Sequence, residues 1–273
     1  LPALCLLLGL AAAPAWAQAP PGAAVGELLT SARAWQAHGR ADLARVALNK
    51  LLQSAPDDPE ALLQLGLLEL EANQMEAAAK VLQRLRASHP ADRRVRELED
   101  AQRIATKDRM RMANVRRLLQ SGEVDAAMQG MRELFPDGAP GGLLGIEYSR
   151  ALARVDGRRD EGLAGLQRLL RENPGEPEFE IAIARHYLGR AATRPDGLAR
   201  LEAISARPDV SQRRVLDLWR DGLSEEPGSA ADRQMLARYL RLAPDGQQML
   251  ALQGRWQGRV PAPVPEAPAV ASP

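Results

Sequence analysis

The chain has 273 residues, of which 45% are hydrophobic and 26% are charged, a balance that is typical of folded globular proteins and excludes a wholly disordered chain. Lysine and arginine number 36 against 35 for aspartate and glutamate, a net charge of +1, which removes the electrostatic reason to expect nucleic acid or an anionic membrane as the main partner. Aromatic residues make up only 3%, and stretches rich in alanine, leucine and arginine favour helices and exclude an all-β fold.

Residues 1–17 have the features of a secretory signal peptide. The apolar run over residues 1–13 is too short to span a bilayer, and small residues at Ala15 and Ala17 stand at the usual cleavage spacing. No initial methionine or basic segment precedes the run, so we expect the sequence to begin within its leader. The single cysteine, Cys5, lies in this leader. The mature chain, after a linker over residues 18–24, is therefore expected to be a thiol-free periplasmic protein of a Gram-negative bacterium.

A period of 34 or 35 residues follows the leader and indicates stacked antiparallel helix pairs. In each period a residue that tolerates a left-handed backbone ends the first helix, a small residue marks where the second helix crosses it, and a proline follows the second helix. These structural repeat positions are Gly39, Ala44, Pro56, Ala78, Pro90, Gly122, Ala127, Gly157, Gly162, Pro174 and Gly197.

The spacing predicts five repeat units and an interruption. We expect units 1 and 2 within residues 25–92 (25–58 and 59–92) and units 3 to 5 within 108–210 (108–141, 143–176 and 177–210). The interval from Ala78 to Ala127 exceeds one repeat by about half a unit, so residues 93–107 are expected to form an extra helix or a break. Residues 211–258 are expected to form degenerate C-terminal helices, and the proline-rich residues 259–273 an extended tail.

This pattern resembles the tetratricopeptide repeat (TPR). The resemblance implies an all-α fold, a TPR solenoid in which antiparallel helix pairs form a right-handed superhelix. A more individual block, residues 117–135 followed by 141–149 and 158–164, resembles the N-terminal periplasmic repeat region of the bacterial cellulose synthase operon protein C family. This second resemblance covers residues 25–243.

The cellulose synthase resemblance carries its own expectations about location and partners. The family joins a signal peptide to a long TPR array and ends in an outer-membrane β-barrel through which glucan leaves the cell. It implies a periplasmic location, with attachment to the outer membrane in the full-length protein. The implied partners are other subunits of a cellulose synthase and export complex, the glucan chain, and a barrel that the resemblance places outside this sequence.

No pattern in the sequence singles out a catalytic, cofactor or metal site. There is no Gly-x-Ser-x-Gly and no Gly-x-x-x-x-Gly-Lys, and His38, His89 and His186 are too far apart to share a helix face. Adjacent carboxylates such as Asp57 and Asp58 stand where they would cap a helix. Carboxylates that are distant in sequence could still meet in the fold and act on a glycosidic bond. We expect no cofactor and no metal.

The candidate binding residues are arginines on the expected concave face. The first helix of each pair lines that face in a superhelix of this kind. Its ninth position is arginine in three of the five units: the residues there are Arg33, Leu67, Arg116, Ala151 and Arg185, with Arg154 close by. Guanidinium groups suit carboxylates and also sugar or backbone oxygens. Chance placement of an abundant residue is the alternative explanation.

Together with the absence of catalytic motifs, the family resemblance implies a non-catalytic periplasmic scaffold of cellulose (exopolysaccharide) biosynthesis and export. It would bind partner proteins, and glucan as a second ligand, through the repeat groove. One alternative is a TPR protein of another envelope assembly or polysaccharide exporter. A third, of a different class, is a cryptic glucan-acting enzyme.

Overall fold

The computed structural model describes residues 21–223, 230–244 and 246–256. These ranges contain fourteen α-helices and no β-strand, which confirms the all-α prediction. The predicted signal peptide and the whole of the predicted proline-rich tail lie outside the described residues. The first helix begins at Pro21, inside the range expected as a linker.

Most of the helices form successive antiparallel pairs. The first helices of the pairs are α1 (Pro21–Ala37), α3 (Pro59–Glu71), α6 (Arg109–Ser121), α8 (Gly142–Leu152) and α10 (Pro177–Leu188). Their second helices are α2 (Ala41–Ser54), α4 (Met75–Ser88), α7 (Val124–Leu134), α9 (Arg159–Glu172) and α11 (Arg194–Ser205). The remaining helices are α5 (Arg93–Ala105), α12 (Gln212–Leu223), α13 (Ala230–Leu242) and α14 (Gln247–Trp256).

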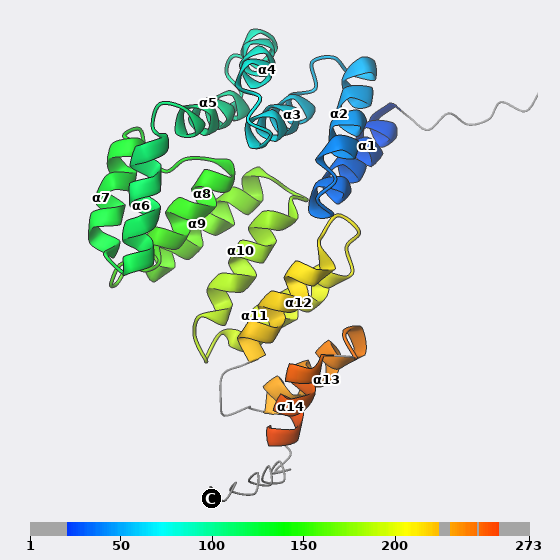
Figure 1. The fold of residues 1–273 in the computed structure, drawn as a ribbon, viewed down its shortest axis with the longest axis vertical. Helices are drawn as coiled ribbons and strands as arrows, with labels where there is room; N and C mark the ends of the chain where they lie inside the picture. Colours follow the sequence, from blue (N-terminus) through cyan, green and yellow to red (C-terminus); the bar gives the residue numbers. More distant parts are fainter. Residues whose placement is uncertain (1–20, 224–229, 245, 257–273) are drawn as a thin grey trace, which may run out of the picture.

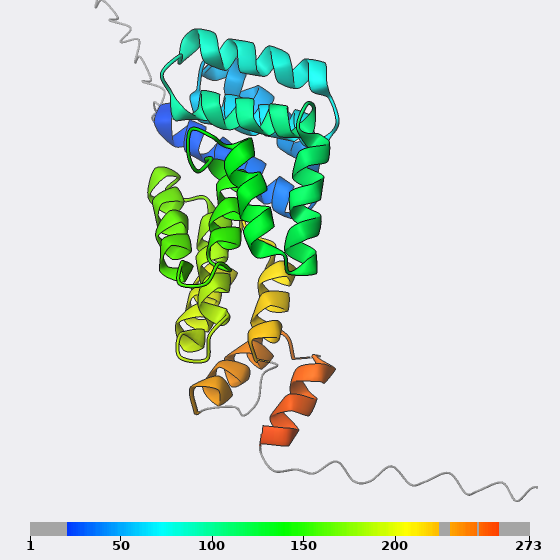
Figure 2. The same ribbon diagram turned by 90° about the vertical axis from the view of Figure 1, so that its left-hand side faces the viewer.

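The pairs wind into a right-handed superhelix. From α1 and α2 the chain passes over α3 to α5, descends through α6 and α7, and returns through α8 to α12, so that α12 comes back beneath α1 (Figure 1). The view turned by 90° shows the same helices advancing along the long axis towards α13 and α14 (Figure 2). A return of this kind brings the first two pairs next to the fourth and fifth.

Tight reversals join the two helices of a pair. At the end of α6, Gly122 has φ 87°, and its amide donates to the Leu118 carbonyl. Asn73 takes up the corresponding left-handed backbone after α3, with φ 58°; this conformation costs an asparagine less than most side chains. The prolines that stop the second helices follow them closely, namely Pro56 after α2, Pro90 after α4 and Pro174 after α9.

Small residues allow the paired helices to cross closely. Ala44, Ala78 and Ala127 are at most 1% exposed. A Cβ atom at Gly162 would stand 2.6 Å from the Ser149 carbonyl oxygen of α8, and one at Gly197 would stand 2.8 Å from the Ala184 carbonyl oxygen of α10. Neither contact is sterically tolerable, so these helices pack backbone against backbone.

Leucine-rich layers fill the space between pairs. A first hydrophobic cluster runs from Ala32 to Leu98 and joins α1 to α5. Separate clusters join α5 to α8, α8 to α10, and α10 to α14. Helix α5 packs on α3 because Gly66 leaves room for Leu98, whose Cδ2 would be 2.5 Å from a Cβ there. Fully burying each such leucine contributes about 1.5–3 kcal/mol.

Candidate functional site

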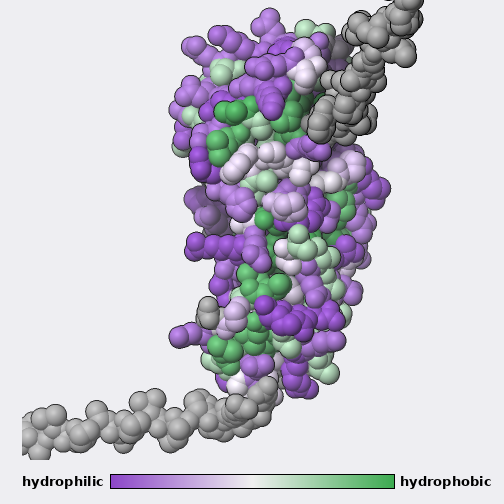
Figure 3. Space-filling model, turned by 90° about the vertical axis from the view of Figure 1, so that its right-hand side faces the viewer, coloured by the Kyte–Doolittle hydropathy of each residue, from purple (hydrophilic) through white to green (hydrophobic). Residues whose placement is uncertain are grey.

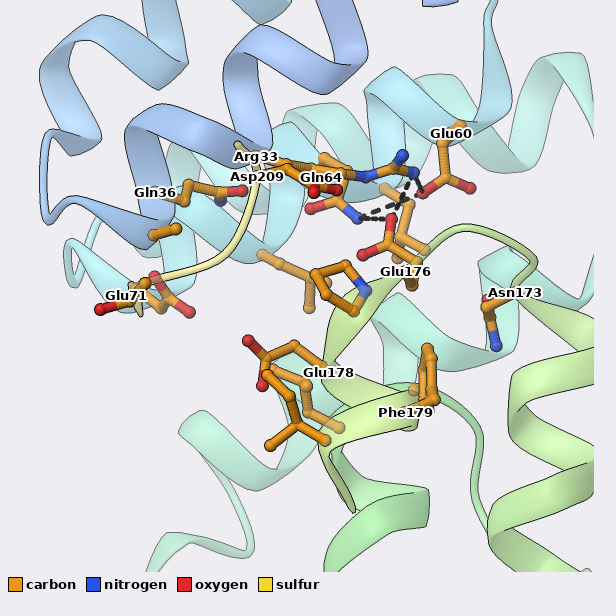
Figure 4. A pocket seen from close by; sticks show the side chains of 18 of the residues that line it. Arg33, Gln36, Glu60, Gln64, Glu71, Asn173, Glu176, Glu178, Phe179 and Asp209 are labelled. Carbon is orange, nitrogen blue, oxygen red and sulfur yellow. Dashed lines mark hydrogen bonds and ion pairs between the residues drawn. The ribbon is translucent and has the colours of Figure 1, made fainter. Parts of the chain in front are cut away.

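A cavity of about 520 Å³ lies on the inner side of the superhelix. Its walls come from α1, α3, α5, α8, α10 and the start of α12, so it is built mainly from first helices. Figure 4 shows it from close by, with Arg33, Glu60 and Glu176 gathered at one side and Glu71 and Glu178 at the other.

Arg33 joins the first helix pair to the fifth across this cavity. Its guanidinium forms an ion pair with Glu176, which lies directly before α10, and approaches Glu60 of α3 at 3.6 Å. The three side chains are only 14–17% exposed. Gln64 donates to both carboxylates, at 3.1 Å to Glu60 and 3.2 Å to Glu176. Elements more than one hundred residues apart in sequence are therefore joined by polar contacts.

Two arginines at the start of α5 extend this junction. Arg94 donates to the second oxygen of Glu60 at 2.8 Å. Arg93 donates to the side-chain oxygen of Asn173 at 2.8 Å and to the Glu172 backbone carbonyl at the end of α9. Helix α5 thus contacts the fourth pair as well as the second. We call the group formed by Arg33, Glu60, Arg93, Arg94, Glu97, Asn173 and Glu176 the buried junction.

Glu97 is the most deeply buried carboxylate of the junction. Its side chain is 9% exposed and lies 3.5 Å from Arg93, and its Oε2 accepts no hydrogen bond. A Cβ at Gly142, where φ is +55°, would stand 2.0 Å from Glu97 Oε1, so only glycine leaves space for this carboxylate. Burial raises the pKa of Glu97 to about 7, although the charge of Arg93 opposes the shift.

The pKa values of the two carboxylates that contact Arg33, Glu60 and Glu176, are shifted in opposite directions. Burial acts to raise the pKa of Glu60, but hydrogen bonds from Gln64 and Arg94 and the arginine charges outweigh it, and this pKa is lowered. Burial raises the pKa of Glu176, with the charge of Arg33 opposing. Carboxylates that share one set of donors commonly separate in this way.

The cavity end of the groove is predominantly acidic. The carboxylates among its lining residues are Glu60, Glu71, Glu97, Glu176, Glu178 and Asp209. The lining arginines are Arg33, held in the junction, and Arg214, which pairs with Glu178 at 2.7 Å. Asp209 pairs with Arg207 at 2.7 Å. Burial raises the pKa of Glu71.

Further along the same first helices the groove becomes basic. Arg150 of α8, Arg154 just after α8, and Arg185 of α10 are exposed. In the described part of the chain none of these three side chains forms a hydrogen bond or an ion pair. Desolvation by the surrounding protein, then the positive charge of Arg185, lowers the pKa of Arg150; the charge of Glu147 opposes this shift, and the charges of Arg154 and Arg214 add to it. We call Arg150, Arg154 and Arg185 the arginine patch.

The structure separates the four arginines that the sequence singled out. Arg154 and Arg185 belong to the arginine patch. Arg116 lies beside it on α6 and is paired with Glu147 of α8 at 2.8 Å. Arg33 is different, because its charge is neutralised by carboxylates inside the buried junction and its Nε, which donates no hydrogen bond, is itself buried.

Sequence reasoning missed Arg150, Glu97 and Glu176. Arg150 is one residue away from the repeat position that was used to find the groove, so a wider window on α8 would have included it. Glu97 lies in the interruption between repeat units, and Glu176 in a connection between helices. Neither position has an equivalent in the repeat, and no local pattern marks them.

Metal-binding clusters and membrane-spanning helices are both absent from the residues that the structure describes. Those residues contain no group of three or more His, Cys, Asp or Glu side chains that could hold a metal ion. None of their helices combines the length and the apolar character needed to cross a membrane. The surface seen from the α1 and α12 side is largely hydrophilic, with narrower hydrophobic areas between polar ones (Figure 3).

Comparison of the sequence with known proteins relates this chain to a protein family. The tetratricopeptide repeat profile matches residues 36–102. Cellulose synthase operon protein C of Pseudomonas fluorescens is 31% identical over 81% of the chain, and that of Xanthomonas axonopodis is 30% identical over 97%. Cellulose synthase 1 operon protein C of Komagataeibacter xylinus is 32% identical over 84%. The chain spans only 17–18% of the length of these relatives.

A solved structure agrees on the fold. The crystal structure of the flexible tandem repeat domain from the C component of bacterial cellulose synthase superposes with a TM-score of 0.53 at 24% identity, covering 86% of this chain and 96% of that one. The predicted resemblance is therefore confirmed. The chain is a tetratricopeptide-repeat protein whose repeats are related to those of the cellulose synthase operon protein C family.

Proposed function

We propose that the chain is a non-catalytic scaffold of bacterial cellulose biosynthesis and export. The observation that carries this proposal is the similarity to cellulose synthase operon protein C proteins, which extends over 81–97% of the chain in three of these relatives. The names of those proteins associate them with cellulose synthesis. In the proposed role this repeat region holds partner subunits of the synthesis and export machinery in the periplasm, in association with the outer membrane.

The groove supplies the surface for such a role. First helices of a TPR superhelix present side chains that are not used to pack their own pairs, and here these side chains carry a cavity and a patch of unpaired arginines. Stacked repeats hold such side chains at fixed spacing, so a partner segment meets a preorganised surface. Partner proteins are the proposed ligands, and glucan, whose hydroxyls can donate to the cavity carboxylates, is the second.

A deletion in the source bacterium tests the scaffold function. We would remove the codons for residues 25–210 in frame and measure cellulose as glucose released by added cellulase. The expected result is loss of cellulose with the synthase subunits still present in the membrane. Normal cellulose output from a strain that makes the shortened protein would overturn the proposal.

Two measurements separate the alternatives. If the deletion removes a different exopolysaccharide and leaves cellulose unchanged, the chain serves another exporter. If the purified chain releases reducing ends from soluble cello-oligosaccharides, and a Glu97→Gln/Glu176→Gln variant that remains folded does not, the chain is a glucan-acting enzyme. The scaffold proposal expects neither result.

A further inference from the structure

The arginine patch is an unusual concentration of unpaired charge in a protein that pairs most of its arginines. Neighbouring groove charges are matched, Arg116 with Glu147 at 2.8 Å and Arg214 with Glu178 at 2.7 Å. Arg150, Arg154 and Arg185 belong to the same groove, and no carboxylate in the described chain forms an ion pair with them, although the charge of Glu147 acts on Arg150. Like charges held close together oppose one another, so a ligand that supplies negative charge relieves this repulsion.

Helix periodicity places the patch on the continuation of the cavity wall. On α8, Leu143 lines the cavity, and Glu147 and Arg150 follow it at i+4 and i+7, the spacing of one helix face. At 1.5 Å per residue, Arg150 lies about 10 Å further along the helix axis, and Arg154 follows in the turn after Leu152, the last residue of α8. On α10, Arg185 follows the cavity residue Glu178 at i+7 in the same way. Cavity and patch are thus two ends of one groove.

We propose that Arg150, Arg154 and Arg185 form the docking site for an acidic stretch of a partner polypeptide that lies extended along the first helices. The proposal rests on the scaffold function and specifies its site and partner chemistry. Guanidinium groups bind carboxylates through two parallel hydrogen bonds. Three of them on two adjacent helices suit several acidic side chains of one extended segment.

The charge distribution along the groove favours a polypeptide over an acidic polysaccharide. A polymer with a carboxylate on every unit would satisfy the patch, but about 10 Å along α10 it would meet Glu178, and beyond it the other cavity carboxylates. A polypeptide can place acidic residues at the patch and neutral or basic residues at the cavity. Complementary patterns of this kind set orientation and reject wrong partners.

Peptide binding tests the site directly. The purified chain would be titrated against fluorescein-labelled hexaglutamate at low salt, with fluorescence anisotropy as the readout. The expected result is saturable binding that the triple variant Arg150→Ala/Arg154→Ala/Arg185→Ala weakens by about tenfold or more. A triple Arg→Lys variant should retain part of the affinity, since lysine keeps the charge but loses the paired donors. Circular dichroism would establish that the variants remain folded.

A matched variant controls for net charge. Lys80, Arg132 and Arg171 are exposed on the second helices α4, α7 and α9 and form no ion pair among the described residues. Replacing these three with alanine removes the same charge, and we expect less than a twofold change in affinity. Equal weakening by both triple variants would assign binding to overall charge and overturn the proposal, as would absence of hexaglutamate binding.

Two further experiments distinguish a polypeptide docking site from an acidic-polysaccharide site and from a failure of the scaffold function. Tighter binding of oligogalacturonate than of hexaglutamate, lost in the same triple variant, would assign the patch to an acidic polysaccharide and overturn the polypeptide proposal. In cells, the Arg150/Arg154/Arg185 variant is expected to lower cellulose output. If it supports normal output while the 25–210 deletion abolishes it, the docking site is wrong and the scaffold function stands.

Discussion

Glu97 illustrates how one buried carboxylate can make stability depend on pH in an unusual direction. Its folded pKa is about 7, against 4.5 for an ordinary glutamate. Between these two pH values the folded protein keeps a proton that the unfolded chain has released. By linkage, the contribution of Glu97 to the free energy of unfolding is then fully present below pH 4.5 and is lost as the pH rises through 7. A shift of this size corresponds to about 3 kcal/mol.

Glu97→Gln should remove most of this dependence. Glutamine has nearly the same shape and no charge, so the variant should be more stable than the wild type at pH 8, by up to about 3 kcal/mol, and similar to it at pH 5. Urea unfolding at pH 5, 6, 7 and 8 measures the difference. Glu176, whose pKa is also raised, leaves a smaller slope in the variant.

Glu76→Gln is the matched control for this prediction. Glu76 is exposed in the first turn of α4 and away from the junction, so its substitution should leave the pH profile parallel to that of the wild type. Parallel profiles for Glu97→Gln as well would show that Glu97 is not a buried acid in solution.

The candidate residues that could be predicted were those with a repeat position. Arg116 and Arg185 follow from periodicity, which is a local property, and the structure puts them, with the nearby Arg154, in one part of the groove. The state of Arg33 could not be predicted, because its neutralising partner Glu176 is brought to it only by the turn of the whole superhelix. Their pairing depends on the summed geometry of the intervening helices.

At the scale of elements, the small residues at helix crossings determine how closely a pair packs. Ala127 of α7 is 0% exposed, whereas its neighbour Ala126 is exposed. Ala127→Leu should therefore force bulk between α6 and α7 and lower the free energy of unfolding by about 1–3 kcal/mol. Ala126→Leu, the same change one position away, should be nearly neutral. Thermal and urea unfolding compare the two; equal effects would mean that the helix phase is wrong.

Glycine at a crossing gives a second test at this scale. Gly162→Ala places a methyl group against the Ser149 carbonyl and the Ala153 amide of α8, and the backbone can yield only by moving the helices apart. The expected loss is about 1–3 kcal/mol.

The control for Gly162→Ala makes the same change where there is space. A Cβ at Gly26, in the exposed part of α1, meets nothing within 4 Å. Gly26→Ala should therefore stabilise the protein by up to about 1 kcal/mol through helix propensity. A loss of stability at Gly26 similar to that at Gly162 would mean that steric contact at the crossing is not the cause.

The helices inside a repeat were more predictable than those outside it. Composition and the 34- or 35-residue period are enough to predict helix pairs, because the turn between the two helices and the leucines buried between them both lie within one repeat. For residues 93–107 the sequence left an extra helix or a break open, and α5 occupies Arg93–Ala105. Asp92, whose side chain accepts from the Arg94 amide at 2.9 Å, caps its start. The contacts of α5 with the fourth pair had no sequence signal.

At the scale of the whole molecule, the first two helix pairs contact the fourth and fifth pairs through the buried junction, which is polar, and not through a shared hydrophobic cluster. The hydrophobic cluster of the first two pairs ends at Leu98 and contains no residue of α8 to α10. Arg33 and Arg93 provide the connection instead, to Glu176 and Asn173. Removing one partner of a buried ion pair leaves the other charge uncompensated, which is strongly unfavourable.

Arg33→Ala/Arg93→Ala should therefore open the superhelix without unfolding its pairs. Without these arginines Glu176 and Glu60 repel each other across the cavity, and the first two pairs can swing away only about the region of α5. Small-angle X-ray scattering should show a larger radius of gyration for the variant, while the helical circular dichroism signal stays within about 10% of the wild type, because each pair keeps its own leucine core.

The control for this opening removes two arginines that pair within the N-terminal helices. Arg40 pairs with Asp42 and Arg86 with Glu99, all of them exposed, so Arg40→Ala/Arg86→Ala should leave the radius of gyration unchanged, since exposed pairs contribute little. High salt should not reproduce the opening, because the junction is buried and only weakly screened. An unchanged radius of gyration in Arg33→Ala/Arg93→Ala would contradict this prediction. It would show that helix stacking through α5 alone fixes the curvature of the superhelix, and that the ion pairs of the buried junction do not stabilise the closed arrangement.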